Sequence, residues 1–455
     1  MNDFSSEPVR PAAAVLADFA ANLAFDDLPP RVVDLARDCL IDAVACAIFG
    51  KDFAWSRMVL DEALASGSGG PCMVPGLPGH RFHLPQAALV LGTFAHSFEL
   101  DSLRKPGAGV HPGATVALPA LAAAQSAGAS GRALLASIVA GCEVMFRIGA
   151  ATMHTPEKRG FHAPGLTGPF GSAAACGKLL GLTSAQLANA FGIAGSLSGG
   201  LLAFARAGRG GMVKRLHLGR AAESGVLAAR LAGRGYEGPD TVLEGEFGLL
   251  DTFCEATDPD QLTRGLGETW EIERLCLKSY ACHVTAQAPI HALRERMDAD
   301  GFTGGDIASI RLAVAPKVIS HHAQRAPRDV MGAQYSVPYA LAIAAVVDPV
   351  NPKVFSERSL QDPKVRDLAQ RIELVEREGV AKGWGADLAI QLRDGRETAA
   401  TAETFPGCPE TPLSRSGLRA KFEALTIGLE PGRGKHLFDI LFDIADTRNV
   451  AELHI

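Results

Sequence analysis

The hydrophobic pattern of this chain of 455 residues changes its period near residue 268. Before that point apolar residues recur at helical spacing, as in "DLPPRVVDLARDCLIDAVACAIFG" (27–50). After it, segments such as "DIASIRLAVAP" (306–316) alternate in the manner of a half-buried strand. A chain with both periods predicts a helical part that is joined to an α+β part.

Start and stop signals support the helical interpretation of the first part. Asp27 is a candidate cap, prolines follow it in the first turn, and Gly50 ends the pattern. Another helix is predicted to open with a capping box formed by Thr183 and Gln186. Glycine (49 residues in the chain) and alanine are abundant here, which indicates helices packed close together.

The second part mixes strand and helix signals. "ADLAIQLRDGRETAATAE" (386–403) consists of two alternating runs joined by Asp394-Gly395, a strong hairpin signal. Helices are predicted in "SVPYALAIAAVV" (336–347) and "DPKVRDLAQRIELVER" (362–377). After Pro406 the chain returns to a helical pattern.

We therefore predict a mainly α protein with an α+β second domain. The helical domain is expected over residues 1–267 and the α+β domain over residues 268–404. A C-terminal segment, residues 405–455, is expected to return to the helical domain.

Composition excludes several classes of protein. Hydrophobic residues (47%) and charged residues (21%) are those of a globular chain, and a net charge of −6 gives no general attraction to nucleic acid. Nine scattered cysteines without a CxxC pair argue against a zinc ribbon and suit a reducing compartment. No leader is visible, and apolar runs such as "YALAIAAVV" (339–347) are too short to span a bilayer. A cytoplasmic location without membrane or nucleic-acid partners is expected.

A proline- and glycine-rich loop carries the first candidate site. It follows Glu99 and Asp101 and delivers His111 to the start of an apolar helix. A helix N-terminus favours the neutral imidazole, which can accept a proton from carbon. The alternative is that His111 merely closes the loop.

A histidine and a basic cluster provide two more candidates. His162 precedes a glycine-rich turn and another apolar helix. The cluster could hold a substrate with several carboxylates, although a solvated helix face is an equally good interpretation. His217 would share the helical face of Lys214. The basic residues of the cluster are Arg206, Arg209, Lys214, Arg215 and Arg220.

The stretch "LCLKSYACHVTAQAP" (275–289) places Lys278 and His283 in an otherwise apolar context. A lysine is unusual in such a stretch unless it has a partner. Tyr339 has a phenol that could donate a proton, although a buried structural tyrosine is the simpler interpretation. His321-His322 has no partner at metal-ligand spacing and no HExxH motif is present, so no metal site is predicted.

Five blocks in order resemble the MmgE/PrpD family, which includes 2-methylcitrate dehydratase, cis-aconitate decarboxylase and an iminodisuccinate epimerase. The resemblance implies a homodimer in which a large helical domain and a smaller α+β lid enclose the site, with no required metal or cofactor. The blocks are "HPGATVALPAL" (111–121), "GFHAPGLTGPFGSAAACGKLLGL" (160–182), "MVKRLHLGRAAESGVLAARLA" (212–232), "GPDTVLEGEFGLLDTF" (238–253) and "LKSYACH" (277–283).

The resemblance also implies a set of site residues. Leu103 stands where related members carry threonine, a departure that bears on the substrate. The residues that match catalytic positions are His111, His162, Lys214, Lys278, His283 and Tyr339. The acidic position of the family corresponds to Glu99, with Asp101 after it. Together with residues of the basic cluster and of the 275–289 stretch, those expected to bind substrate are Glu99, Asp101, Arg215, His217 and Tyr280.

The activities of the family share proton transfer next to a carboxylate. We expect His111 or His162 to act as the base, the lysines to stabilise the anion, and Tyr339 or His283 to supply a proton. The leading prediction is a cofactor-independent hydro-lyase of the 2-methylcitrate dehydratase type that acts on a small polycarboxylate. Alternatives are an isomerase of an imino- or amino-dicarboxylate and a decarboxylase of the cis-aconitate type. A non-catalytic dimeric binding protein is the alternative from another class.

Overall fold

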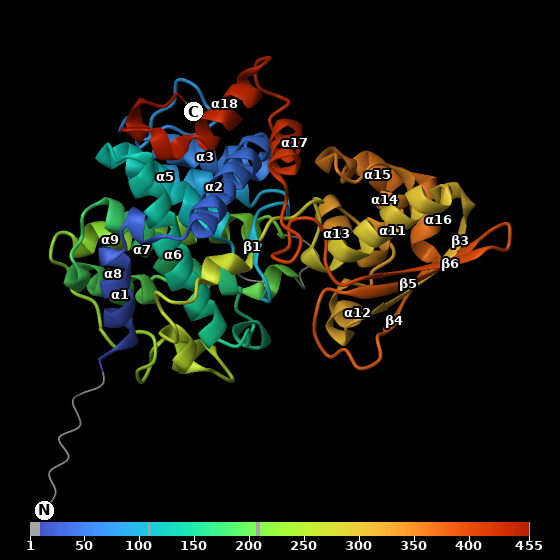
Figure 1. Cartoon of the computed structure of the whole chain (residues 1–455), viewed down its shortest axis with the longest axis horizontal. Helices are drawn as coiled ribbons and strands as arrows, with labels where there is room; N and C mark the ends of the chain where they lie inside the picture. The colour runs from blue at the N-terminus through green and yellow to red at the C-terminus, as the bar shows by residue number, and fades with distance from the viewer. Residues whose placement is uncertain (1–9, 108–109, 206–209, 455) are drawn as a thin grey trace, which may run out of the picture. The chain divides into compact units, whose positions relative to one another are not determined.

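A computed structural model describes residues 10–107, 110–205 and 210–454 of the chain (Figure 1). The chain divides into two compact units. Unit 1 comprises Met1–Ser97, Asp101–Leu275 and Thr426–Ile455, and unit 2 comprises Phe98–Leu100 and Cys276–Leu425. Unit 1 is built from helices and unit 2 contains a four-stranded sheet, so the predicted fold class is confirmed. The predicted domain boundaries stay a prediction, because compact packing does not test independent folding.

Unit 1 is a set of helices that pack around apolar and small residues. Its longest helices are arranged around α4 and α7: α9 packs against both, α6 packs against α7, and α2 packs against α4 (Figure 1). The α-helices of unit 1 are α1 (Ala12–Asn22), α2 (Pro30–Gly50), α3 (Ala54–Ala65), α4 (Leu84–Ala95), α5 (Leu118–Ala127), α6 (Gly131–Ala151), α7 (Ala163–Leu179), α8 (Ser184–Ser196), α9 (Val213–Ala232), α10 (Leu249–Phe253) and α18 (Arg433–Phe442).

Two predicted helix caps lie in unit 1, and the structure confirms one of them. Helix α2 begins at Pro30 and ends at Gly50, but Pro29 occupies the N-cap position. Asp27 instead belongs to a short 3-10 turn, where its carboxylate accepts a hydrogen bond from the Ala24 N–H at 3.1 Å. The prediction that Asp27 caps the helix was therefore wrong, because a nearer backbone N–H takes its side chain. The predicted capping box at Thr183 is confirmed.

Close approach between helices depends on glycine. A Cβ at Gly219 of α9 would lie 2.2 Å from the Thr93 hydroxyl of α4, and one at Gly225 would lie 2.4 Å from the Pro169 carbonyl of α7. Both distances are far below van der Waals contact, so only glycine permits these crossings. They hold the start of α9 near the end of α4 and the start of α7.

Helix α6 is long and apolar enough to cross a membrane by length and composition alone. However, 89% of its apolar window is buried inside the protein. It also carries Glu143 and Arg147, which form a buried ion pair at 3.3 Å. These features are those of a core helix. The sequence analysis had considered only shorter apolar runs and had not identified this one.

Unit 2 is organised around a mixed sheet with the strand order β4-β3-β5-β6. Strands β3 (Ile307–Val314) and β5 (Ala386–Leu392) are antiparallel, as are β5 and β6 (Glu397–Ala402). The predicted hairpin at Asp394-Gly395 is confirmed: Gly395 has a φ of +91°, which favours glycine.

One predicted helix in unit 2 is shorter than expected. Helix α16 (Pro363–Gln370) is capped by Asp362, whose carboxylate accepts from the Lys364 N–H at 2.8 Å. The helix was predicted to continue to residue 377, but β4 (Ile372–Glu376) follows it and pairs in parallel with β3. The alternating run "IELVE" completes the sheet, and this pairing outweighs its local helical pattern.

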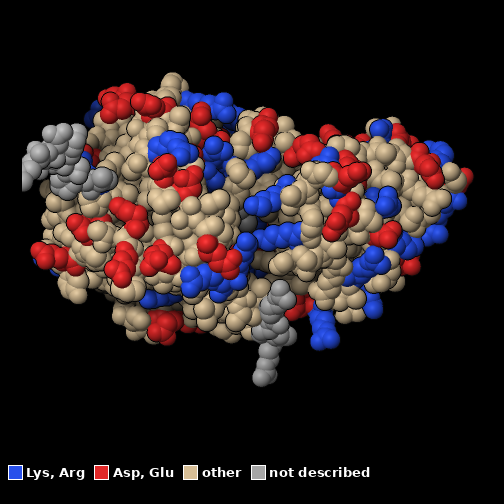
Figure 2. Space-filling view, turned by 90° about the horizontal axis from the view of Figure 1, so that it is seen from below, with Lys and Arg blue, Asp and Glu red and all other residues tan. Residues whose placement is uncertain are grey.

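Further helices contact the sheet, and α11, α14 and α16 lie along one side of it in Figure 1. The other helices of unit 2 are α11 (Gln287–Asp300), α12 (Pro316–His322), α13 (Val330–Tyr335), α14 (Val337–Val346), α15 (Glu357–Gln361) and α17 (Arg415–Leu425). On the visible face of each unit, acidic and basic side chains are interspersed (Figure 2).

Candidate functional site

Unit 1 gathers most of the predicted site residues into one group, here named the histidine cluster. His96 follows the last turn of α4, His162 is the N-cap residue of α7, and Lys214 lies in the first turn of α9. The cluster consists of His96, Asp101, His111, His162, Lys214, Arg215 and His217. Arg206 and Arg209 of the predicted basic cluster lie outside the described residues, and Arg220 forms an exposed ion pair with Glu223.

His111 is delivered by an irregular helix start. The following segment, Gly113–Ala117, is π-helical, a form that is rare and often occurs at functional sites. The Thr115 hydroxyl donates to the His111 carbonyl at 2.7 Å, and the Ser102 hydroxyl accepts from the Gly113 N–H at 3.0 Å. These bonds satisfy backbone groups of the helix start and fix the position of the imidazole.

Asp101 is a fully buried carboxylate that bridges two imidazoles. It lies 3.0 Å from His96 Nδ1 and 3.0 Å from His111 Nδ1. His111 Nδ1 also lies 3.0 Å from the Ser102 carbonyl oxygen. Because these neighbours are all acceptors, both Nδ1 atoms carry a proton, and further chemistry of each ring is left to its Nε2 atom.

Electrostatics keep this group in one ionisation state. Burial alone raises the pKa of Asp101, but the two imidazoles that donate to it hold this pKa well below the usual range. Burial lowers the pKa of His96 to about 3, and Lys214 adds to that effect against the opposing Asp101. Asp101 is therefore ionised and His96 neutral at neutral pH. The His96 Nε2 atom has no hydrogen-bond partner among the described residues.

His162 and His217 form a second imidazole pair. Their Nδ1 atoms lie 3.0 Å apart, so one donates and the other accepts. Burial, reinforced by the charge of Lys214, holds the pKa of His162 well below its usual range, and the same two causes lower the pKa of His217. Lys214 is thus a buried cation next to three neutral histidines. Arg215, also buried, donates to the His96 carbonyl at 3.2 Å.

The same cluster contains a possible cation site. Donor atoms of His96, Asp101 and His111 all lie within 4.8 Å of one another. The hydrogen bonds to Asp101 already explain this convergence, and the neighbouring charge of Lys214 opposes a further cation. The absence of a metal requirement stays a prediction.

Unit 2 contains a second group, the Lys278 cluster, defined as Glu99, Lys278, His283, His322 and Tyr335. Lys278 is buried, and its ammonium donates to the Glu99 carbonyl at 2.9 Å and approaches the Glu99 carboxylate at 3.5 Å. The buried lysine is therefore paired, which accounts for its place in an apolar stretch. Glu99 has a φ of +57°, a left-handed conformation that glutamate rarely adopts.

Three rings complete the Lys278 cluster. His283 stacks on His322 with ring centroids 4.1 Å apart, and the Tyr335 ring lies 5.1 Å from His283. The Tyr335 hydroxyl donates to the Glu99 carboxylate at 3.5 Å. His283 Nδ1 lies 2.9 Å from the Thr285 hydroxyl and 3.5 Å from the Thr285 N–H, so Thr285 holds the ring in place.

Two tyrosines predicted from the sequence have other surroundings. The Tyr339 hydroxyl donates to the Ser359 carbonyl at 2.8 Å. Tyr280 is buried, its pKa is raised by burial, and the charges that act on it include those of Arg294 and Asp348. Cys282 is buried with its pKa raised to about 12 by burial, so it is a neutral packing thiol.

Three site residues were missed by the sequence analysis: His96, His322 and Tyr335. His96 lies five positions before Asp101 in "HSFELD", and His322 had been considered only as a metal ligand. Tyr335 lies four positions before Tyr339, which the sequence analysis had singled out. Close spacing of polar residues in apolar stretches was the available signal.

Each cluster combines a buried cation with imidazoles, the groups that transfer protons next to an anionic group. A match to the MmgE/PrpD N-terminal domain covers residues 14–262, and a match to the MmgE/PrpD C-terminal domain covers residues 280–441. The chain belongs to the MmgE/PrpD family, as the sequence motifs had indicated.

Curated relatives carry a common name. A cis-aconitate decarboxylase of Aspergillus terreus (strain NIH 2624 / FGSC A1156) is 29% identical over 97% of this chain and 94% of its own length. The cis-aconitate decarboxylase-like protein oryM of Aspergillus oryzae (strain ATCC 42149 / RIB 40) is 29% identical over 98% of this chain and 97% of its own. The cis-aconitate decarboxylase of Homo sapiens is 27% identical over 87% of this chain and 84% of its own.

Proposed function

We propose that the chain is an enzyme that decarboxylates a small unsaturated polycarboxylate of the cis-aconitate class. Membership of the family supports an enzyme of this general kind. The names of the relatives favour the decarboxylase alternative over the hydro-lyase that led the sequence analysis, which is not confirmed. Homodimer formation, independence of cofactors and a cytoplasmic location stay predictions.

The observation that carries this proposal is the Asp101–His111 pair. Loss of CO2 breaks a carbon–carbon bond and leaves the electron pair on the substrate, which must then take up one proton at carbon. The His111 Nε2 atom is the candidate carrier of that proton, because Asp101 holds the proton on Nδ1 at 3.0 Å. The Asp101 carboxylate would stabilise the imidazolium before transfer, as a carboxylate does in other acid–base pairs.

Lys214 and Arg215 are proposed to stabilise the negative charge that develops on the substrate. Both are buried, and a cation in a water-poor site acts on charge more strongly than one in solvent. His162 is a poor proton carrier because its low pKa keeps it neutral. We assign it a hydrogen-bonding role through its pair with His217.

Lys278 and His283 are proposed as further functional residues. Glu99 lies two positions before Asp101 in the chain, so one short segment supplies a carboxylate to each cluster. The left-handed backbone at Glu99 supports a functional role, since such conformations cluster at active sites. His283 is an alternative source of the proton for the substrate carbon.

The test is an assay of the purified chain with cis-aconitate, 2-methylcitrate and an imino-dicarboxylate in D2O buffer that contains EDTA. Proton NMR would follow the organic product, and a separate measurement would follow CO2. We expect CO2 release from cis-aconitate with one solvent deuterium at carbon in each product molecule, and unchanged turnover with EDTA.

Each other outcome identifies a different activity. An alkene formed from the hydroxy acid without CO2 would restore the hydro-lyase prediction. Deuterium exchange of the imino-dicarboxylate without an alkene would indicate an isomerase. If the protein is folded but converts none of the three compounds, the result would contradict the proposal and favour a binding protein.

A further inference from the structure

A cavity of about 650 Å³ lies within unit 2 and belongs to neither cluster described above. Its volume is in the range of small-molecule sites. Residues from the loop between α12 and α13 and from α14, α15 and α16 line it. The residues that matter to the argument are Arg325, Arg328, Tyr339, Leu360, Arg366 and Gln370.

The loop that supplies two of the arginines is held in place. The Gln370 side chain donates to the Arg325 carbonyl at 3.1 Å, and the Ser336 hydroxyl donates to the Gln324 carbonyl. One anchor comes from α16 and the other from the junction of α13 and α14. The cavity wall is therefore a fixed part of unit 2 rather than an isolated loop.

The cavity has an excess of positive charge. Among the described residues, Arg325, Arg328 and Arg366 form no ion pair and no side-chain hydrogen bond, whereas the one lining carboxylate, Asp367, pairs with Arg371 at 2.8 Å. Three like charges around one cavity repel one another, and a bound anion would offset that repulsion. Guanidinium groups bind carboxylates and phosphates through paired N–H donors.

The cavity floor is apolar and aromatic. Tyr339 is 1% exposed and Leu360 is buried, so a ligand there would lose contact with water on one side. Burial raises the pKa of Tyr339 while the charge of Arg366 opposes that effect, which places the arginine near the phenol. Because the Tyr339 proton is donated to Ser359, the phenol is a wall of the cavity rather than a proton source.

We propose that this cavity is a binding site for a small organic polyanion that carries two or more carboxylate or phosphate groups. The three guanidinium groups bind the charged groups, and Tyr339 and Leu360 contact the carbon skeleton. The site is separate from the proposed reaction, so it does not depend on the decarboxylase assignment. It also gives Tyr339 a role other than the catalytic one predicted from the sequence.

The test is isothermal titration of the full chain with two probes, citrate and inorganic pyrophosphate. The titrations use the Lys214→Met variant as background, which weakens binding of citrate at the histidine cluster. We expect one site per chain for at least one probe. Binding of citrate alone would identify polycarboxylates as the ligands, and binding of pyrophosphate alone would identify phosphorylated compounds.

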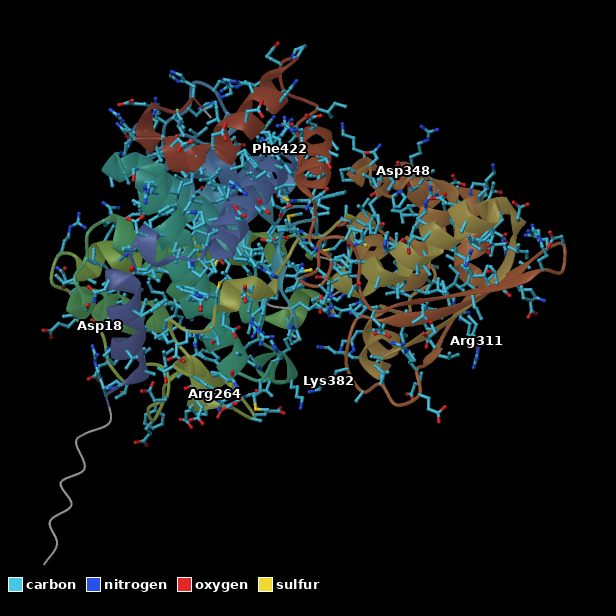
Figure 3. The ribbon with its side chains drawn as sticks, in the orientation of Figure 1. Asp18, Arg264, Arg311, Asp348, Lys382 and Phe422 are labelled. Carbon is cyan, nitrogen blue, oxygen red and sulfur yellow. The ribbon has the colours of Figure 1, made fainter. Side chains whose placement is uncertain are left out.

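Arginine variants assign the site. Arg366→Gln is expected to weaken binding about tenfold, and Arg328→Ala with Arg366→Gln about a hundredfold. The matched control is Arg311→Gln, because Arg311 is an exposed arginine on β3 of the same unit (Figure 3). Circular dichroism would verify that each variant folds. If the double variant does not fold, the affinity of Arg366→Gln alone decides whether the probe binds in this cavity.

Two results would overturn the proposal. One is the absence of binding for both probes at concentrations of about 1 mM, where a weak metabolite site would still be detected. The other is unchanged affinity in Arg366→Gln and in the double variant, because the probe would then be bound elsewhere.

Discussion

Replacement of Asp101 by asparagine tests the central element of the proposed site. The carboxylate accepts hydrogen bonds from His96 Nδ1 and His111 Nδ1, both at 3.0 Å. Asparagine has nearly the same shape, but only one of its two terminal atoms is an acceptor. At least one imidazole would therefore face an N–H group and lose its preferred tautomer.

The expected size of the effect follows from these contacts. A hydrogen bond to a charged group contributes about 1.5 to 3 kcal/mol, and the imidazolium of His111 would lose both this bond and the neighbouring negative charge. A loss of about 3 kcal/mol in the transition state corresponds to a decrease in kcat of about a hundredfold. The decrease should affect kcat more than KM, since Asp101 is fully buried behind His111.

The assay is steady-state decarboxylation of cis-aconitate, with circular dichroism to verify folding. The control is Glu143→Gln, which alters another fully buried carboxylate of unit 1, one whose partner is Arg147. We expect the control to keep kcat within about threefold of the wild type. If the Asp101→Asn variant is folded and its kcat also lies within about threefold of the wild type, the acid–base role of the Asp101–His111 pair is refuted.

Four further predictions concern individual side chains. Lys214→Met should lower kcat by about a hundredfold or more, because a preorganised charge stabiliser is lost, and steady-state kinetics would show it. Tyr335→Phe should lower turnover because the Tyr335 hydroxyl donates to Glu99. Tyr339→Phe should lower only the free energy of unfolding, by about 1 kcal/mol, because the Tyr339 hydroxyl donates to the Ser359 carbonyl. An equal loss of turnover in both variants would contradict this prediction. Burial lowers the pKa of His96 to about 3, so unfolded His96 binds a proton that the folded chain excludes. The free energy of unfolding should therefore be unaffected by this residue above pH 6.5 and should fall by about 1.4 kcal/mol for each pH unit below it. Urea unfolding of His96→Gln should lack this pH dependence. Burial raises the pKa of Glu143 to about 7, which gives the opposite sign: the free energy of unfolding should fall by about 3 kcal/mol as the pH rises from 4.5 to 7. Urea unfolding of Glu143→Gln over this pH range should lack that decrease.

Local signals predicted much of the fold because most elements agree with their own sequence. The capping box at Thr183 and the turn at Asp394-Gly395 are satisfied by side chains and backbone within a few residues. The segment Ile372–Glu376 is different, since its strand form depends on pairing with β3, which lies about 60 positions earlier. No local pattern reports such a partner.

The histidine cluster could be predicted in part. His111 and His162 each precede a helix in the sequence pattern and Lys214 belongs to the basic cluster, and the structure brings the three together. Their roles as a group depend on close helix crossings at Gly219 and Gly225, which position α9 against α4 and α7. A sequence shows that glycine is present but does not show which helices it joins.

The two tyrosines show where helical spacing is misleading. Tyr335 and Tyr339 are four positions apart, so a continuous helix would place them on one face and give them one set of neighbours. The helix is interrupted at Ser336, whose extended backbone (φ −91°, ψ 115°) ends α13 and whose hydroxyl caps α14 through the Tyr339 N–H at 3.0 Å. The interruption separates their hydroxyl groups, which bond Glu99 and Ser359 respectively. A serine before Val-Pro is a start signal for a new helix, and that signal, rather than the period of four, decides which tyrosine belongs to the Lys278 cluster.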